Sequence, residues 1–207
     1  KVGTGELILS GANTFQGGTT LNAGTLTLGN AAALGTGALT VTGAGTLQSN
    51  AALTTSNAIT LNANLTVGGV NPLTLGGVVS GGSGLIKTGA SSLALTGNNT
   101  YTGTTALNAG SLVVGSNTAL GTSVLNATAG TTLDASAAVS LGNNINLGGN
   151  LTLGGSNALT LGGAVAGIGG LIKNGPADLI LNGANTYLGT TALNAGKLVV
   201  GTDGALG

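Results

Sequence analysis

The chain has 207 residues, 42 of them Gly, and its four Lys balance four acidic residues, so the formal net charge is zero. It contains no His, Cys, Met, Trp or Arg. Imidazole, thiolate and guanidinium groups carry out most metal ligation, nucleophilic catalysis and anion binding in proteins. The composition therefore predicts no enzyme, no cofactor and no metal site. A zero net charge also gives no field that attracts nucleic acid.

The same composition predicts a β core. Leu, Ile, Val and Phe make up 55 of the 207 residues, which exceeds the roughly 20 % below which chains fail to build a core. Gly costs roughly 1 kcal/mol per interior helix position relative to Ala, so its abundance disfavours long helices. No apolar run approaches the roughly 18 residues of a membrane helix. Two Tyr and one Phe are too few for the aromatic girdles of a membrane barrel.

Taken in chain order, the sequence is a tandem repeat with a period of 86 residues. Residues 1–86 align without a gap with residues 87–172 and share 44 identities, and residues 173–207 restart the unit and stop partway. The aromatic residues keep this spacing at Phe15, Tyr101 and Tyr187. Repetition of this kind indicates stacked modules, so we expect two units and a partial third within one continuous solenoid.

Short apolar triplets recur within each unit. Those of the first unit are Leu7-Ile8-Leu9, Leu26-Thr27-Leu28, Leu39-Thr40-Val41, Leu65-Thr66-Val67 and Leu73-Thr74-Leu75. In each triplet the outer two side chains face a core and the middle one faces water. We therefore expect an all-β fold: a single-stranded parallel β-helix, or β-solenoid, right-handed because of the crossover preference. With coils of roughly 20 residues, each unit has about four coils and the chain about ten.

Gly and Asn recur where these coils are expected to turn. The corner sequence Asn-Ala-Gly occupies the same place in all three units, and both Asn and Gly tolerate the positive φ that a corner requires. These corner residues are Asn22, Gly24, Asn108, Gly110, Asn194 and Gly196. A further Asn precedes the Thr-aromatic pair of each unit, at Asn13, Asn99 and Asn185. We expect these residues and the three aromatics to hold structural positions of the repeat.

The most regular block reads SGANTFQGGTTLNAGTLTLGN from Ser10, TGNNTYTGTTALNAGSLVVGS from Thr96 and NGANTYLGTTALNAGKLVVGT from Asn182. It resembles the passenger-associated repeat of bacterial autotransporters. The resemblance implies a right-handed parallel β-helix that crosses the outer membrane and is displayed on the cell surface or outside the cell. It also implies an outer-membrane barrel domain elsewhere in the parent chain, of which this chain is expected to be an excised stretch. The absence of Cys suits export through an oxidising compartment.

The carboxylates are too scattered to suggest a catalytic pair. The four acids are Glu6, Asp134, Asp178 and Asp203, and glycoside hydrolysis needs two carboxyl groups within about 10 Å. A hydrolase or lyase that used Asp178 and Asp203 on neighbouring coils is the enzymatic alternative. Lys1 with Glu6, and Lys173 with Asp178, share one spacing and predict exposed ion pairs, which contribute about 0 to 1 kcal/mol each.

The aromatics have two possible roles. Exposed, they could stack on sugar rings, but one aromatic per four coils stands nearly 20 Å from the next at about 4.8 Å per coil. Partial burial against a turn or side wall is the alternative that we favour.

The sequence thus predicts a structural repeat module of a bacterial surface or extracellular protein. It would form a rigid β-helical stalk or fibre for adhesion, cell-cell contact or filament assembly, with length set by repeat number. The alternative is a passenger domain that binds carbohydrate or a host surface along a side wall. Expected partners are further copies of the chain, associating head-to-tail or laterally through open strand edges, with cell-surface glycans or neighbouring cells as other partners.

Overall fold

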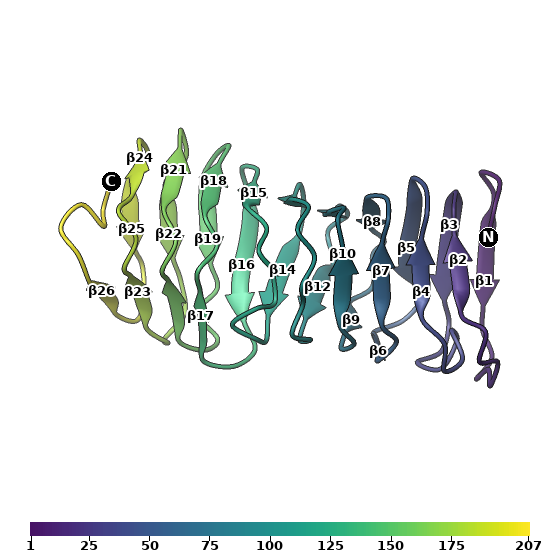
Figure 1. Ribbon diagram of the computed structural model, residues 1–207. Coiled ribbons are helices and arrows are strands. Elements are labelled where there is room, and N and C mark those ends of the chain that lie inside the picture. The colour runs from purple at the N-terminus through teal and green to yellow at the C-terminus, as the bar shows by residue number, and fades with distance from the viewer.

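The computed structural model describes residues 1–207 and winds them into a rod of ten coils without a helix (Figure 1). The strand pairs are parallel, and each pair joins one coil to the next. Typical partners are Leu65 and Leu85, which occupy the same place in successive coils. The N-terminus lies at one end of the rod and the C-terminus at the other. The expected all-β, parallel β-helix of about ten coils is confirmed.

Three faces run along the rod. The first face is a ten-stranded sheet with one strand in every coil. Its strands are β1 (Glu6–Leu9), β3 (Gly24–Leu28), β5 (Gly45–Ser49), β8 (Leu65–Val67), β11 (Leu85–Lys87), β13 (Thr105–Leu107), β15 (Leu125–Ala127), β18 (Ile145–Leu147), β21 (Val165–Gly167) and β24 (Thr186–Tyr187).

The second face is an eight-stranded sheet that begins only in the third coil. Its strands are β6 (Leu53–Thr55), β9 (Leu73–Leu75), β12 (Ser92–Leu95), β14 (Ser111–Val114), β16 (Thr131–Ala135), β19 (Leu151–Leu153), β22 (Leu171–Lys173) and β25 (Thr191–Leu193).

The third face consists of two four-stranded sheets with two coils between them. The strands of the first sheet are β2 (Thr19–Leu21), β4 (Leu39–Val41), β7 (Ile59–Leu61) and β10 (Val79–Gly81). Those of the second are β17 (Val139–Leu141), β20 (Leu159–Leu161), β23 (Leu179–Leu181) and β26 (Leu198–Val200). Backbone bonds continue across the intervening coils, from Thr100 N to Val79 O (2.9 Å) and from Thr122 N to Tyr101 O (3.2 Å).

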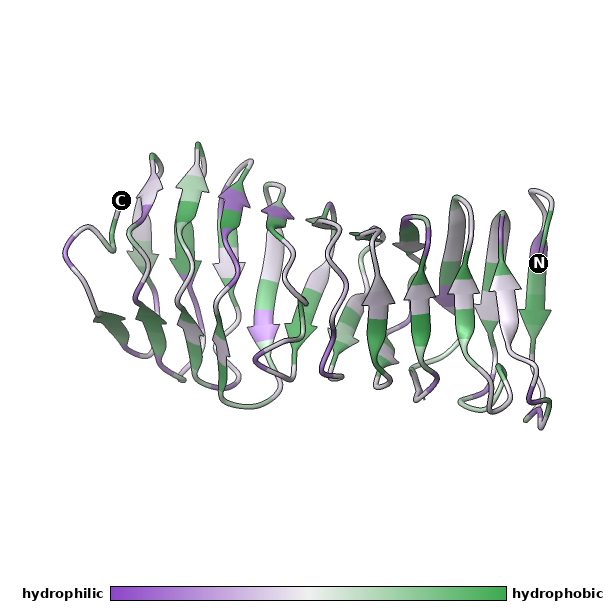
Figure 2. Ribbon diagram, viewed as in Figure 1, coloured by the Kyte–Doolittle hydropathy of each residue, from purple (hydrophilic) through white to green (hydrophobic).

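A single apolar core fills the rod. It contains 42 buried apolar residues, and apolar residues recur along the strands of successive coils (Figure 2). Three of the five predicted triplets place their side chains as expected: in β8, for example, Leu65 and Val67 are buried, and Thr66 between them is half-buried on the outer side. In β3 the middle residue Thr27 is buried as well, and in the outermost strand β1 Leu7 and Ile8 are exposed. Because a Leu or Val lies directly above the equivalent residue of the previous coil, each strand extends the core by one layer.

Equivalent strands of successive units lie on different faces. β1, β12 and β23 begin units one, two and three, and they lie on the first, second and third face respectively. From β1 to β12 the chain passes through four complete coils and moves on by one more face. One unit therefore spans four and one third coils, which corresponds to about 20 residues per coil, as is typical of solenoids. The expected four coils per unit omitted the remaining third of a turn.

The gaps in the faces come from one stretch of the repeat. In the first two coils, residues 10–18 and 30–38 form no strand, and they leave the second face empty of strands there. The equivalent residues 96–104 and 116–124 interrupt the third face in coils five and six. From the first unit to the second, the strandless segment thus advances by one face, together with the strands. In the third unit the equivalent residues 182–190 lie on the first face and include the two-residue strand β24.

Candidate functional site

A lysine closes one corner in each unit. In the second unit, Lys87 ends β11 at an inward-facing position and is 1 % exposed. Its ammonium donates to the carbonyl oxygens of Thr88 (2.6 Å), Gly89 (2.8 Å) and Ala109 (3.2 Å). An ammonium has three N–H donors, so it has one for each carbonyl. We call this arrangement the lysine clamp; it ties the end of one strand to the Asn-Ala-Gly corner of the next coil.

The lysine clamp recurs in the other units. Lys173 donates to the carbonyls of Asn174 (2.7 Å), Gly175 (2.8 Å) and Ala195 (3.3 Å). Lys1 likewise donates to the carbonyls of Val2 (3.0 Å), Gly3 (2.6 Å) and Ala23 (2.9 Å). Burial lowers the pKa of Lys87 and of Lys173, and at Lys173 the charges of Asp178 and Asp134 act in the opposite direction.

The expected ion pairs of these lysines are therefore wrong. Lys1 and Lys173 use their ammonium groups for backbone carbonyls, and the one ion pair joins Lys197 to Asp178 at 4.0 Å. The reason is that carbonyls at a tight corner lose water on folding and need a donor. A signal for this role was present in the sequence, because Lys occupies an inward position in the triplets Leu85-Ile86-Lys87 and Leu171-Ile172-Lys173.

The Asn before the Thr-aromatic pair bridges three coils. Asn99 Oδ1 accepts from the backbone N–H of Val79 in the coil before it (2.8 Å), and Asn99 Nδ2 donates to Ala119 O in the coil after it (2.6 Å). Asn185 makes the equivalent bonds with Val165 and Ala205. Asn13 of the first unit donates to Ala33 O at 2.7 Å. These side chains replace ladder bonds where the strandless segment lacks them.

The Asn-Ala-Gly corners place their Gly in the left-handed region. φ is 74° at Gly24, 72° at Gly110 and 74° at Gly196, and no residue other than Gly has a positive φ. A Cβ at Gly110 would lie 2.5 Å from the Ser91 carbonyl oxygen. The corner Asn residues contribute backbone bonds: Asn22, Asn108 and Asn194 donate their N–H groups to the carbonyls of Lys1, Lys87 and Lys173.

The two tyrosines lie in the core. Tyr101 is fully buried, and its hydroxyl lies 2.6 Å from Thr105 Oγ1, which in turn lies 2.9 Å from Ser123 Oγ. Burial raises the pKa of Tyr101, and the hydrogen bonds with Thr105 and Ser123 oppose that effect. Tyr187 is also buried, whereas Phe15 in the first coil is 40 % exposed. The tyrosine rings are therefore not available as a platform for sugars.

The four acids have separate surroundings. Glu6 accepts from Gln48 Nε2 at 3.2 Å, and Asp134 accepts from the N–H of Ser156 at 3.0 Å. Asp178 pairs with Lys197, and Asp203 is exposed. No three residues of the types His, Cys, Asp and Glu form a group that could hold a metal ion. The chain forms no helix long and apolar enough to cross a membrane.

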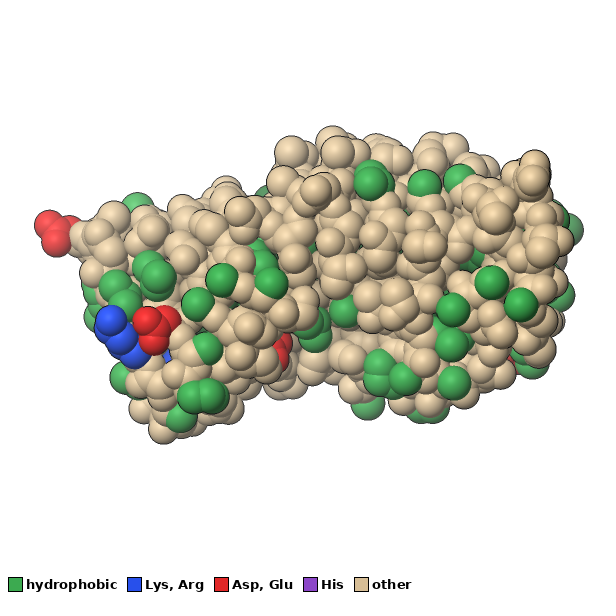
Figure 3. All heavy atoms as spheres, turned by 90° about the horizontal axis from the view of Figure 1, so that it is seen from below, with side chains coloured by type: hydrophobic (Ala, Val, Ile, Leu, Met, Phe, Trp, Pro, Cys, Tyr) green, Lys and Arg blue, Asp and Glu red, His purple; other side chains and the backbone are tan.

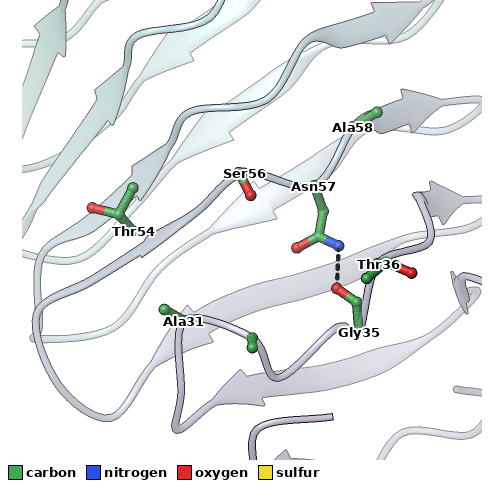
Figure 4. A pocket seen from close by; sticks show the side chains of 8 residues that line it. Ala31, Gly35, Thr36, Thr54, Ser56, Asn57 and Ala58 are labelled. Atoms are coloured by element: carbon green, nitrogen blue, oxygen red, sulfur yellow. Dashed lines mark hydrogen bonds between the residues drawn. The ribbon is translucent and has the colours of Figure 1, made fainter. Parts of the chain in front are cut away.

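The two largest surface pockets occupy equivalent places in successive units. The first has a volume of about 600 Å³ and lies between residues 31–36 and residues 54–58 (Figure 4). The second, of about 410 Å³, lies between residues 117–124 and residues 142–144. Seven of the eight positions that line the first pocket recur, one repeat unit later, in the second. We call them the unit pockets.

An Asn lies at the base of each unit pocket and fastens the strandless segment to the next coil. Asn57 Nδ2 donates to the carbonyls of Gly35 (3.0 Å) and Gly37 (2.8 Å). Asn143 Nδ2 donates in the same way to Gly121 (3.1 Å) and Ser123 (2.8 Å). The first unit pocket adjoins β6, where the second face begins, and the second adjoins β17, where the third face resumes. The unit pockets therefore also advance by one face per unit.

Tandem coils, clamped corners and one shared core define the chain as a repeat β-solenoid. The model of the passenger-associated-transport-repeat matches residues 1–28, 85–114 and 171–200. The chain is 31 % identical over 153 residues, 69 % of its length, to the adhesin BmaC autotransporter of Brucella suis biovar 1, and it spans 4 % of the length of that relative. No solved structure matches.

These comparisons show three passenger-associated-transport repeats in the chain and make it similar to a passenger repeat region of the autotransporter class. Such a region is exported across the outer membrane and exposed at the bacterial surface. The family matches begin at the clamp lysine or at the start of its strand, at positions 1, 85 and 171. Each match therefore includes the clamp lysine and the Asn-Ala-Gly corner that accepts its hydrogen bond.

Proposed function

We propose that the chain is a rigid stalk or fibre segment that separates a bacterial surface from whatever the parent protein contacts, in adhesion, cell-cell contact or assembly of an extracellular layer. The observation that carries this proposal is the single core shared by ten coils. At about 4.8 Å per coil the segment spans about 48 Å. Because each coil provides the template for the next, the length of the rod grows with the number of units.

The parent protein is proposed to carry an outer-membrane barrel in another part of its chain, and to place its adhesive task at a tip or flanking domain. The chain itself is proposed to have no enzymatic role. What supports this is the separate placement of its acids and the likeness to an adhesin, of which the chain matches only a small part. An activity screen on polysaccharides, repeated with Asp178 and Asp203 both changed to Asn, tests the hydrolase alternative.

The proposal is tested by changing the number of units in the parent protein. Variants with one, two or four repeat units should fold equally well, and the length of the rod in electron micrographs should grow by about 21 Å for each unit. Cell-cell aggregation should depend on that length. Aggregation that is unchanged when all units are removed would contradict a stalk role.

Self-association is the second part of the proposal. The outermost strand β1 has a free edge, and Ile8 within it is 52 % exposed. A chain of these bounds is expected to associate head-to-tail, because unpaired strand edges template further pairing. Analytical ultracentrifugation at rising concentration should show linear oligomers. A chain that stays monomeric at the highest soluble concentration would refute this expectation.

Recognition of carbohydrate or a host surface along a side wall is the second candidate function. The buried tyrosines argue against an aromatic platform, and the unit pockets are the concave features that favour this function. A glycan array tests it independently of the stalk role, since a stalk needs no ligand.

A further inference from the structure

The two unit pockets share a chemistry as well as a position. No charged residue lines either of them, and the surface seen in Figure 3 is mostly neutral with few charged side chains. A charged ligand would lose water here without gaining a counter-charge, which is unfavourable. The walls of the first pocket instead combine methyl groups of Ala31, Ala32 and Ala58 with hydroxyl groups.

Several of the polar groups have no partner within the chain. In the first unit pocket the hydroxyls of Thr36, Thr54 and Ser56 make no hydrogen bond to protein atoms. In the second, the Thr122 hydroxyl and the Asn144 carboxamide nitrogen are likewise free. These groups can donate to, or accept from, a ligand that lies against the base of the pocket. An apolar ligand would leave them unpaired, at a cost of about 1 to 3 kcal/mol for each group that becomes buried.

Asn57 and Asn143 make the base of each pocket rigid. Both carboxamide nitrogens are already committed to two carbonyls of the strandless segment. The position of the wall therefore does not depend on the ligand, so little ordering is needed on binding. Figure 4 shows Ser56 and Asn57 on one coil facing Gly35 and Thr36 on the previous one.

We propose that each unit pocket is a binding site for an uncharged, hydroxyl-rich ligand, namely a short neutral oligosaccharide, with one site per repeat unit. The proposal deepens the second candidate function above and is independent of the stalk role. Because a unit spans four and one third coils, successive sites point to successive faces of the rod. A site returns to the same face after three units, or thirteen coils, which is about 62 Å.

This spacing defines the kind of partner. A polysaccharide lying straight along one side of the rod would meet one site in three, so it would gain little avidity. Separate glycan ends that approach from different sides would each find a site. The rod is thus suited to many independent weak contacts, with dissociation constants in the millimolar range for a few hydrogen bonds each.

The test is an NMR titration of the chain with maltotriose, cellotriose and N-acetylated chitotriose, and with sialyllactose as the charged probe. We expect shifts at residues 31–36, 54–58, 117–124 and 142–144 from at least one neutral probe, saturating at two ligands per chain. Thr36→Arg should abolish the shifts at the first site alone, and Thr122→Arg those at the second alone. The matched control is Thr102→Arg, an exposed Thr outside both pockets, which should leave both sites unchanged.

Three results would overturn the proposal: no shift from any neutral probe at millimolar concentration, shifts that survive both Arg variants in a folded chain, or tighter binding of sialyllactose than of the neutral probes. Circular dichroism melts of the variants establish that they fold. A failed titration combined with length-dependent cell aggregation would remove the binding sites and leave the stalk role intact.

Discussion

The triplets Leu85-Ile86-Lys87 and Leu171-Ile172-Lys173 have the same sequence but lie on different faces of the rod. The first is β11 on the first face and the second is β22 on the second face. In both, Leu and Lys are buried and Ile lies between them, half-buried. The clamp distances nearly coincide, at 2.6, 2.8 and 3.2 Å for Lys87 and 2.7, 2.8 and 3.3 Å for Lys173. Local structure therefore follows the segment and its corner, and the face on which it lies makes no difference.

This equivalence of faces explains how a unit with a fraction of a coil can be stacked. A segment that fits the first face in one unit fits the second face in the next, because each face presents the same Leu and Val layers to the core. A whole number of coils per unit is not needed. Surface features of the repeat then spread around the rod, which keeps identical patches of a nearly uncharged surface from lining up along one side.

Removing a clamp lysine should cause the largest loss. Lys87→Met and Lys173→Met each leave three carbonyls without their donor, at a cost of about 1 kcal/mol per carbonyl. We therefore expect each variant to lose about 3 kcal/mol of the free energy of unfolding, measured by urea denaturation. If faces are equivalent, the two losses should agree within about 1 kcal/mol. Lys197→Met, at a 69 % exposed side chain, is the control and should change stability by less than about 0.5 kcal/mol. A large difference in stability between the two clamp variants would show that the first and second faces are not equivalent.

The corner Gly should come next. Gly110→Ala and Gly196→Ala force a side chain into the left-handed region and against a carbonyl oxygen 2.5 to 2.6 Å away. We expect a loss of about 2 kcal/mol at either corner. Gly142→Ala is the matched control, because φ is not positive there and no atom lies within 4 Å of the added Cβ. Equal losses in control and corner variants, measured by thermal unfolding, would show that corner geometry is not the cause.

The bridging Asn should have a somewhat smaller effect. Asn99→Ala leaves the Val79 N–H and the Ala119 carbonyl unpaired in a buried place, and we expect a loss of about 2 kcal/mol. Hydrogen exchange should speed up at the N–H of Val79, in the coil before, because that N–H loses its acceptor. The exposed Asn50 has no side-chain hydrogen bond, so Asn50→Ala should leave exchange unchanged. Faster exchange confined to the coil of Asn99 itself would contradict the bridging role.

Tyr101 should give the smallest effect, and one that depends on pH. Tyr101→Phe loses the hydrogen bond to Thr105, at about 1 kcal/mol near neutral pH. Because burial raises the pKa of Tyr101 above its usual 10.0, the unfolded chain releases the phenol proton first as the pH rises. The contribution of the Tyr101 phenol to the stability of the fold is therefore fully present below pH 10, and it is lost as the pH rises through the pKa of Tyr101 in the folded chain.

The stability difference between wild type and Tyr101→Phe should shrink above about pH 10. The lowered pKa of Lys87 and Lys173 has the opposite effect on stability. Between the folded pKa of these lysines and 10.5 the unfolded chain binds more protons than the folded one, so their effect makes the fold more stable as the pH rises. The effect of the lysines is the same in wild type and in Tyr101→Phe, so it cancels in the stability difference between them. A difference that stays constant up to pH 11 would contradict the burial of the phenol.

The strands were predictable because their signal is local. A triplet such as Leu65-Thr66-Val67 shows its inward and outward positions in its own sequence, and stacking such triplets into coils of about 20 residues leads directly to a solenoid. The positive φ at Gly110 was predictable for the same reason, because an Asn-Ala-Gly sequence at a fixed place in each unit requires a residue without a Cβ.

The extra third of a turn per unit and the lysine clamp both depend on how neighbouring coils lie against each other. The repeat period alone does not specify that arrangement. Dividing the repeat period of 86 residues by a coil of roughly 20 residues gives about 4.3, but a coil one or two residues longer would give a whole number. Only the order of the sheets shows that β1 and β12 lie on different faces. The sequence predicts an ion pair for Lys173, as for Lys1, because a charged side chain suggests a charged partner. In the fold these lysines meet carbonyls that the corner has turned inward, and the position of those carbonyls follows from the path of the next coil.

The most direct test of the one-third turn per unit is a pair of distances between spin labels, since the chain has no Cys of its own. Thr40 and Asn126 are equivalent positions of successive units, on β4 of the third face and β15 of the first. Thr46 and Asn126 lie in one row of the first face, separated by four coils. With Cys at these positions, the 46–126 distance should be about 19 Å, four coils along one face. The 40–126 distance should be clearly longer, because it also crosses the rod. Two equal distances would mean a whole number of coils per unit and would contradict the account.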